Sequence, residues 1–306
     1  MVLDKLINMV KLGRLIGHAA ILVYALGALF AIVVGASFDV AKFVIGYVIL
    51  FTAILAAIYT NNYNDVEIDR HSKHTFFSGG SSILVDHPEL IKTTRYVAIT
   101  LYGISILLSF VFVTMFSYSF TLFLYIMFGI FLGWCYTSPP LRLVYRGFGE
   151  FTTMIGAGFI IPGFGYFILR GTIDAPFVVF SIPLMLFGLS LSLYLELPDK
   201  NADTNGQKRT FVVRRGEHLG FILGLLSTIL VICCFVIFAA GPFLTVPLNF
   251  WLIALFCVLP IIVGWWSLRN YSMDATKLAP IVFRAITCIF LFYILLDIYL
   301  IYVVVI

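Results

Sequence analysis

Long apolar segments dominate this chain and set what it can fold into. Nine of them each hold about the twenty apolar residues that a helix needs to cross a bilayer. They span residues 15–37, 43–60, 93–115, 118–135, 151–169, 176–195, 218–240, 246–268 and 281–304. Only 11% of the residues are charged, against about a quarter in soluble domains. The sequence therefore predicts an all-α polytopic membrane protein with about nine transmembrane helices, in a single domain over residues 1–306.

The basic residues favour one side of these segments. Among the 19 Lys and Arg, only Lys42 and Arg170 fall in connections after odd-numbered segments. Because basic residues concentrate on the cytoplasmic side, we expect the N-terminus and the polar regions 61–92 and 196–216 to be cytoplasmic. Arg14 begins the first segment, where it either reaches the interface or contacts an anionic substrate. The net charge of +4 gives no indication of a nucleic-acid partner.

A polar stretch, residues 61–70, interrupts the apolar sequence after the second segment. If it continues the preceding helix, Asn61, Asp65 and Asp69 lie four residues apart on one helical face. Carboxylates at this spacing repel each other and destabilise a helix. The same row offers the oxygen ligands that a hard divalent cation prefers. We therefore expect this first acidic row to bind a metal ion.

A second acidic row follows the sixth segment. Asp199 and Asp203 repeat the spacing of the first row, and Glu196 precedes them. A lysine also follows each row, Lys73 after the first and Lys208 after the second. Repeated halves are familiar in membrane proteins. The chain is therefore predicted to have two related four-helix halves plus a final helix, with each half supplying part of one site.

The two rows together suggest a ligand with a polar head and an apolar tail. Their four aspartates, with Glu196 beside them, cannot all stay ionised in a poorly solvated place without cations, and one or two Mg²⁺ would suit them. Aromatic side chains, 17% of the chain, could stabilise an allylic cation. Basic side chains suited to a diphosphate lie nearby in the sequence: Lys73, Arg142, Arg146, Lys208 and Arg209.

Three motifs resemble those of the UbiA-type intramembrane prenyltransferases. Residues 61–69 resemble the first, N-D-x-x-D-x-x-x-D, and residues 199–210 resemble the second, D-x-x-x-D followed by G-K-x-T. Residues 136–150, Y-x-x-P-P-L-R-x-x-Y-R-G-x-G-E, resemble the loop after the fourth helix. Asn62 departs from the family, which often has Asp there. Glu196 stands where menaquinone-type members often have Asn, and it could be a metal ligand or a base near the acceptor.

The resemblance implies Mg²⁺-dependent transfer of a prenyl group from a prenyl diphosphate to an aromatic or other lipophilic acceptor, in quinone or lipid biosynthesis. The residues expected to act in catalysis are Asp65, Asp69, Asp199, Asp203 and Glu196. Asn61 and the four aspartates would hold two Mg²⁺. The residues expected to contact the substrates are Asn61, Lys73, Tyr136, Arg142, Tyr145, Arg146, Lys208, Arg209 and Arg14.

Three other classes of membrane protein are alternatives to this interpretation. An ion-coupled secondary transporter would place ionisable residues near the bilayer midplane, whereas these acids lie at segment ends. A phosphatidyl-group transferase also uses aspartates four residues apart, but the Asp-Gly and Ala-Arg pairs expected ahead of them are missing here. A purely structural membrane protein has little reason to carry two matching acidic rows. Among acceptors, the Ser-Gly-Gly loop and Glu196 slightly favour a dihydroxynaphthoate-like compound.

Overall fold

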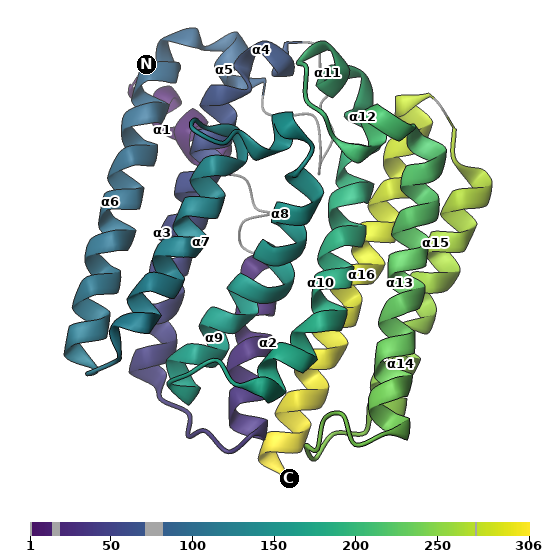
Figure 1. Ribbon diagram of the computed structural model, residues 1–306. Coiled ribbons are helices and arrows are strands. Elements are labelled where there is room, and N and C mark those ends of the chain that lie inside the picture. Colours follow the sequence, from purple (N-terminus) through teal and green to yellow (C-terminus); the bar gives the residue numbers. More distant parts are fainter. Residues whose placement is uncertain (1, 14–18, 71–81, 273) are drawn as a thin grey trace.

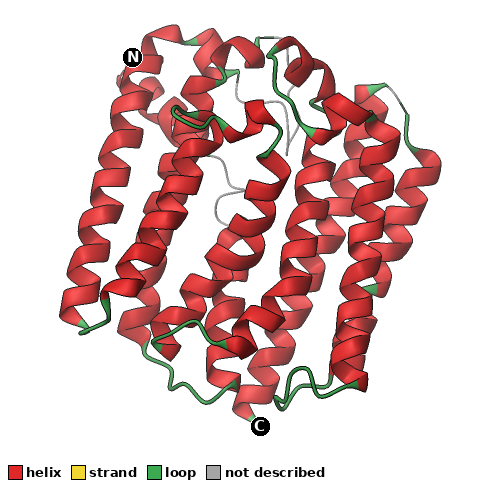
Figure 2. Cartoon of the chain, viewed as in Figure 1, coloured by secondary structure: helices red, strands yellow, loops and turns green. Residues whose placement is uncertain are grey.

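The structure is a computed structural model that describes residues 2–13, 19–70, 82–272 and 274–306. All regular secondary structure within these residues is helical (Figure 2), which confirms the predicted class. Arg14 and Lys73, two of the predicted substrate contacts, lie outside the described residues.

Eight helical runs within the described part of the chain are long and apolar enough to cross a membrane. They coincide with the second to ninth predicted segments. In chain order they are α3 (Val40–Asn64), η2 with α6 (Pro88–Leu90 and Ile91–Met115), α7 (Phe120–Thr137), α8–η4–α9 (Gly149–Ile155, Gly156–Ile160 and Ile161–Arg170), α10 (Ala175–Glu196), α13 (Glu217–Ala240), α14 with α15 (Phe250–Phe256 and Val258–Asn270) and α16 (Ala275–Val305).

The first predicted segment, 15–37, is represented by a shorter helix. This helix, α2 (Ala20–Val33), has 14 residues and rises about 21 Å, less than the roughly 30 Å of a bilayer core. The two chain termini nevertheless lie at opposite ends of the bundle (Figure 1). Helix α2 runs beside the eight longer runs and packs along α9 and α16.

The two halves of the bundle repeat one packing arrangement. Helix α3 packs along α6 in the first half, and α10 packs along α13 in the second. Helix α2 lies between the halves, against α9 and α16. Its contact with α9 is close because Gly27 faces the backbone of Pro162 and Gly165 faces the backbone of Tyr24, where a Cβ atom would have no room. Small residues allow such close helix contacts in membranes.

Short elements gather at one end of the bundle, called here the polar end (Figure 1). They are α1 (Val2–Leu12), α4 (Val66–Asp69), α5 (Ile83–Asp86), η3 (Leu143–Arg146), α11 (Lys200–Asn205) and α12 (Phe211–Arg215). Both acidic rows lie at this end. The two halves therefore bring their acidic rows to the same end of the bundle, as the sequence predicts.

Candidate active site

The first acidic row follows a nearly continuous helical path. Helix α3 ends at Asn64, and Asp65 departs from helical geometry before α4 begins. The helical hydrogen bonds continue across this kink, because the amide of Asp65 donates to the carbonyl of Asn61 and that of Asp69 donates to Asp65, both at 2.9 Å. Asp65 and Asp69 are both buried.

The second acidic row begins where α10 ends. Pro198 follows Glu196 by two residues, and the helix resumes as α11 only after Asp199, the residue that precedes its first turn. The amide of Asp203 donates to the carbonyl of Asp199 at 2.8 Å, which matches the bond across the first row. Asp203 is buried, whereas Asp199 is half-buried.

Lys208 joins the two rows. Its Nζ lies 3.0 Å from Oδ2 of Asp65 and 3.2 Å from Oδ1 of Asp203. All three side chains are largely removed from solvent. Charges buried together interact more strongly than exposed ones. A single ammonium group therefore links carboxylates that are far apart in the sequence.

The loop between α7 and α8 closes over this cluster. Tyr145 donates a hydrogen bond of 2.7 Å from its hydroxyl to Oδ1 of Asp65, so both oxygens of that carboxylate are engaged. The guanidinium of Arg142 stacks 4.0 Å from the centroid of the Tyr145 ring. The amide of Arg209 donates to the carbonyl of Val144, which fastens the segment after the second row to this loop.

The electrostatics of the cluster follow from burial and charge. Burial raises the pKa of Asp203, and the opposite charge of Lys208 only partly counteracts it. Burial disfavours the charged form of Lys208, but the carboxylates of Asp65 and Asp203 outweigh burial and hold its pKa well above the ordinary value. Burial and the Asp65 charge raise the pKa of Tyr145, which keeps its hydroxyl protonated as a donor.

Other predicted site residues are placed around this centre. Asn61 accepts a 2.7 Å hydrogen bond on Oδ1 from the Thr137 hydroxyl. Tyr136 lies near enough to Lys208 and Asp203 to interact with their charges. The side chains of Arg142, Arg146 and Arg209 are exposed at the polar end.

The described residues contain no group of three or more His, Cys, Asp or Glu side chains that would hold a metal ion unaided. The donor set still fits Mg²⁺, because within the described residues Asp65 and Asp203 share one ammonium group, that of Lys208. Mg²⁺ commonly binds through one or two carboxylates, substrate phosphates and water. These residues therefore suit an ion that arrives with a phosphorylated ligand.

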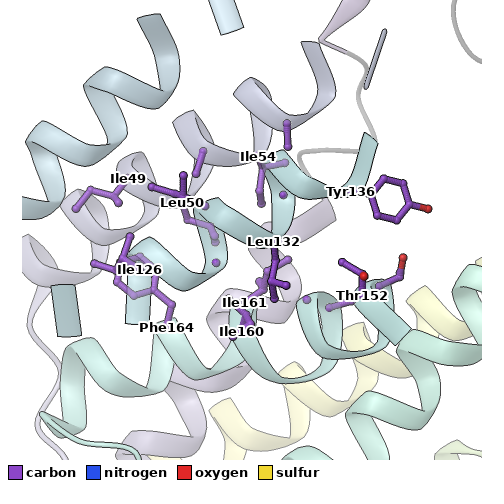
Figure 3. A pocket seen from close by; sticks show the side chains of 18 of the residues that line it. Ile49, Leu50, Ile54, Ile126, Leu132, Tyr136, Thr152, Ile160, Ile161 and Phe164 are labelled. Atoms are coloured by element: carbon purple, nitrogen blue, oxygen red, sulfur yellow. The ribbon is translucent and has the colours of Figure 1, made fainter. Parts of the chain in front are cut away.

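An apolar cavity of about 370 Å³ begins at Asn61, one helical turn before Asp65. Asn61, Tyr136, Thr152 and Thr153 line its polar end, and aliphatic and aromatic side chains line the remainder. Figure 3 shows Tyr136 and Thr152 on one side and Phe164 with other apolar residues on the opposite side. The walls come from α3, α6, α7 and the α8–η4–α9 run. This donor cavity, as we name it, can hold a hydrocarbon tail.

Sequence reasoning gave no role to Glu150, although it ends the third motif. The structure buries Glu150 and has its Oε1 accept a hydrogen bond from the amide of Phe211. Its charge also acts on the carboxyl group of Glu196. The signal available in the sequence was a carboxylate directly before an apolar segment, beside a glycine-rich turn.

Comparison with known proteins agrees with this geometry. Residues 20–292 match the model of the UbiA prenyltransferase family. The chain belongs to this family. A curated relative, 1,4-dihydroxy-2-naphthoate octaprenyltransferase of Bacillus subtilis, is 28% identical over 212 residues, which are 69% of this chain. The match spans 66% of that relative, just under two thirds of its length.

Solved structures of UbiA homologues share the fold. A homologue from Archaeoglobus fulgidus bound to GPP and Mg²⁺ aligns over 97% of this chain and 100% of its own, with a TM-score of 0.63 and 13% identity. Another structure of an Archaeoglobus fulgidus homologue gives a TM-score of 0.67 at 13% identity, over 99% and 100% of the two chains. A digeranylgeranylglyceryl phosphate synthase gives 0.62 at 15% identity, over 96% and 99%. The helical membrane fold of this UbiA family member is therefore one already seen in solved proteins.

Proposed function

We propose that this protein transfers a prenyl group from a prenyl diphosphate to a lipophilic aromatic acceptor within the membrane, with Mg²⁺. One observation carries the proposal: a buried polar cluster lies close to an apolar cavity of about 370 Å³. The cluster is formed by Asp65, Asp203, Lys208 and Tyr145. Asn61, one turn before Asp65, and Tyr136, which interacts with Lys208 and Asp203, line the polar end of the cavity. A polar centre joined to an apolar cavity fits a ligand with a charged head and a hydrocarbon tail.

Mg²⁺ would be held by Asp65 and Asp203, with Asp69 and Asp199 as further ligands and Asn61 at the edge of the site. We propose two ions, one for each acidic row. When bound, Mg²⁺ supplies charge neutralisation for the diphosphate group. A homologue solved with GPP and Mg²⁺ supports the proposal by analogy.

The chain's own residues would bind, orient and neutralise the donor. Lys208 would stabilise the departing diphosphate as the allylic C–O bond breaks. Its ammonium group would act there because the bridging oxygen of the diphosphate gains negative charge in this step. Arg146 and Arg209, at the rim, would bind the outer phosphate oxygens. The ring of Tyr136 lies at the cavity mouth, where its π face could stabilise positive charge on the first carbon of the prenyl chain.

The acceptor that we favour is a dihydroxynaphthoate-type compound. The support is the curated relative, whose name gives that acceptor and an octaprenyl donor. The product would belong to quinone biosynthesis.

The deciding experiment incubates membranes containing the protein with Mg²⁺, one labelled prenyl diphosphate and a panel of acceptors: 1,4-dihydroxy-2-naphthoate, 4-hydroxybenzoate, homogentisate and a glycerol phosphate ether. Labelled product only with the naphthoate supports the proposal. Product only with another acceptor overturns the acceptor class, and absence of product with every acceptor overturns prenyl transfer.

We also propose that the site faces the cytoplasm, since basic residues accumulate at the polar end. A cysteine introduced at Gln207, an exposed residue of the second polar region, should react with a membrane-permeant thiol reagent only. Labelling of intact cells by an impermeant reagent at that cysteine would reverse the orientation.

A further inference from the structure

The ammonium group of Lys208 lies between the two acidic rows, against one carboxylate oxygen of each. Its Nζ is 3.0 Å from Oδ2 of Asp65 and 3.2 Å from Oδ1 of Asp203. The other oxygen of Asp65 already accepts the hydrogen bond of Tyr145. A metal ion that links Asp65 to Asp203 therefore meets oxygens that already have a partner.

Such an ion and the ammonium group would repel each other. Because Mg–O distances are about 2.1 Å, Mg²⁺ on either of these two oxygens would lie within about 5 Å of Nζ of Lys208. The side chains involved are largely removed from solvent, and like charges repel more strongly there than in water. Lys208 and a metal ion therefore compete for the carboxylates of the two rows.

The backbone that carries Lys208 is docked on the first row, but its side chain is flexible. The amide of Lys208 donates to the carbonyl of Asp203 at 2.9 Å. Gly206, in the same turn, packs against Ile68 of α4, where a Cβ atom would lie 2.3 Å from Cγ1 of the isoleucine. A lysine carries its charge on a flexible four-carbon stem. The ammonium group can therefore change partners while the turn keeps its place.

A second partner for the ammonium group would lie close by. Tyr136 interacts with the charge of Lys208 and lines the polar end of the donor cavity. A donor whose tail fills this cavity would hold its diphosphate between Tyr136 and the acidic rows. Phosphate oxygens accept strong, charge-assisted hydrogen bonds from ammonium groups. Lys208 can therefore pass from carboxylate to phosphate by a movement of its side chain.

We propose that Lys208 is an exchangeable cation of the site, which pairs with Asp65 and Asp203 until divalent metal ions bind these carboxylates and then moves its ammonium group to the donor diphosphate. This inference rests on the proposed function and adds how metal and donor binding are coupled. Metal ions alone must displace Lys208 without a new partner, whereas the diphosphate supplies one. Each ligand therefore strengthens the binding of the other through Lys208.

The first test measures the binding of Mg²⁺ alone, by calorimetry on the detergent-purified protein without any donor. Lys208→Met keeps the length of the side chain and removes its charge. We expect this variant to bind Mg²⁺ roughly 5- to 150-fold more tightly than the wild type, the range typical of coupled sites. Its prenyl transfer should nevertheless fall, because the diphosphate loses the ammonium group. Metal affinity and turnover would thus change in opposite directions.

Two further variants control this measurement. Lys208→Arg keeps a positive charge at the position and should bind Mg²⁺ as weakly as the wild type. Arg215→Met removes an exposed positive charge at the same end of the bundle. It should change the Mg²⁺ affinity less than about twofold, because salt screens exposed charges.

The second test uses the wild type, so it does not depend on the folding of a variant. The amine of Lys208, paired with two buried carboxylates, is shielded from a water-soluble amine-modifying reagent. Adding Mg²⁺ should increase the modification of Lys208, and adding Mg²⁺ together with inorganic pyrophosphate should suppress it again. Mass spectrometry of the digested protein gives the extent of modification, with the exposed Lys5 of α1 as internal reference.

Three outcomes would overturn the inference. Equal or weaker Mg²⁺ binding by Lys208→Met would mean that the ammonium group supports the metal site. An equal gain in Arg215→Met would make the effect one of overall charge. Unchanged modification of Lys208 on adding Mg²⁺ would show that it keeps its carboxylates. None of these readouts requires prenyl transfer, so failure of the proposed function is recognised separately, by the absence of product with every acceptor.

Discussion

At the first acidic row, Asp65 is fully engaged: Tyr145 donates to one of its carboxylate oxygens and Lys208 pairs with the other. At the second row, Asp203 pairs with Lys208 among the described residues, and Asp199 is half-buried. The spacing of the acids and the helical hydrogen bond between them are the same in both rows. The difference lies in the surroundings.

The two rows have different cavities near them. Asn61, at the start of the first row, lines the donor cavity. The second row instead follows Glu196, whose neighbour Glu150 lines a second cavity of about 230 Å³, between α8, α10, α12 and α13. The two halves therefore keep one spacing of carboxylates, while the residues that flank each row differ.

The largest expected effect separates the two rows. Asp65→Asn should lower kcat/KM for the prenyl diphosphate about 10³-fold, or about 4 kcal/mol of transition-state stabilisation, because it removes the charge of a proposed Mg²⁺ ligand. Asp199→Asn, at a half-buried position, should cost about 10- to 100-fold. Steady-state kinetics at saturating acceptor measure both, and thermal unfolding checks that each variant remains folded. Equal losses in the two variants would remove the functional asymmetry between the rows.

The next effect concerns the residue shared by both rows. Lys208→Ala should lower kcat about 10²-fold and also weaken donor binding, because charge on the departing diphosphate loses a partner. Arg215→Ala, a matched control on an exposed residue, should change turnover less than twofold. Donor titrations of both purified variants at saturating Mg²⁺ give the comparison. If both variants change turnover only slightly, Lys208 neutralises the charge of Asp65 and Asp203 but does not act on the diphosphate.

A smaller effect is expected in the donor cavity, which adjoins the first row. Ala157 lines the donor cavity, so Ala157→Leu should raise the KM of a long prenyl diphosphate about tenfold by filling space that the tail needs. A short donor should be affected little. Ala41→Leu, at an exposed position of α3, is the control. If long and short donors respond alike, the tail lies outside this cavity.

The smallest effect on turnover is expected at Asn62. Its Nδ2 donates to the carbonyls of Leu12 at 3.3 Å and Ile58 at 2.8 Å, so it joins α1 to α3 and faces away from the cluster. Asn62→Asp restores the residue often found in the family but removes both donors, and should lower the free energy of unfolding by about 1–3 kcal/mol. Turnover per folded molecule should stay near that of the wild type. Chemical denaturation and kinetics on the same preparation test the two parts, and a large change in Mg²⁺ dependence would assign Asn62 to the metal site.

The sequence by itself determined the helical membrane class, eight of the crossings and the spacing within each acidic row. These features are local: an apolar run of about twenty residues is readable without its neighbours, and aspartates four residues apart share a helical face in any helix. The first crossing was also located, although α2 is shorter than the predicted segment.

The tertiary structure alone decided which residues from different rows meet. Lys208 lies far from Asp65 in the sequence, and their contact depends on how the two halves pack. The two cavities have the same origin, since each is bounded by side chains from several helices. The burial of Glu150 and its hydrogen bond from the amide of Phe211 likewise come from contacts between segments far apart in the sequence. Spacing along one chain segment carries no information about partners on another, because helix packing rather than helix formation sets those distances.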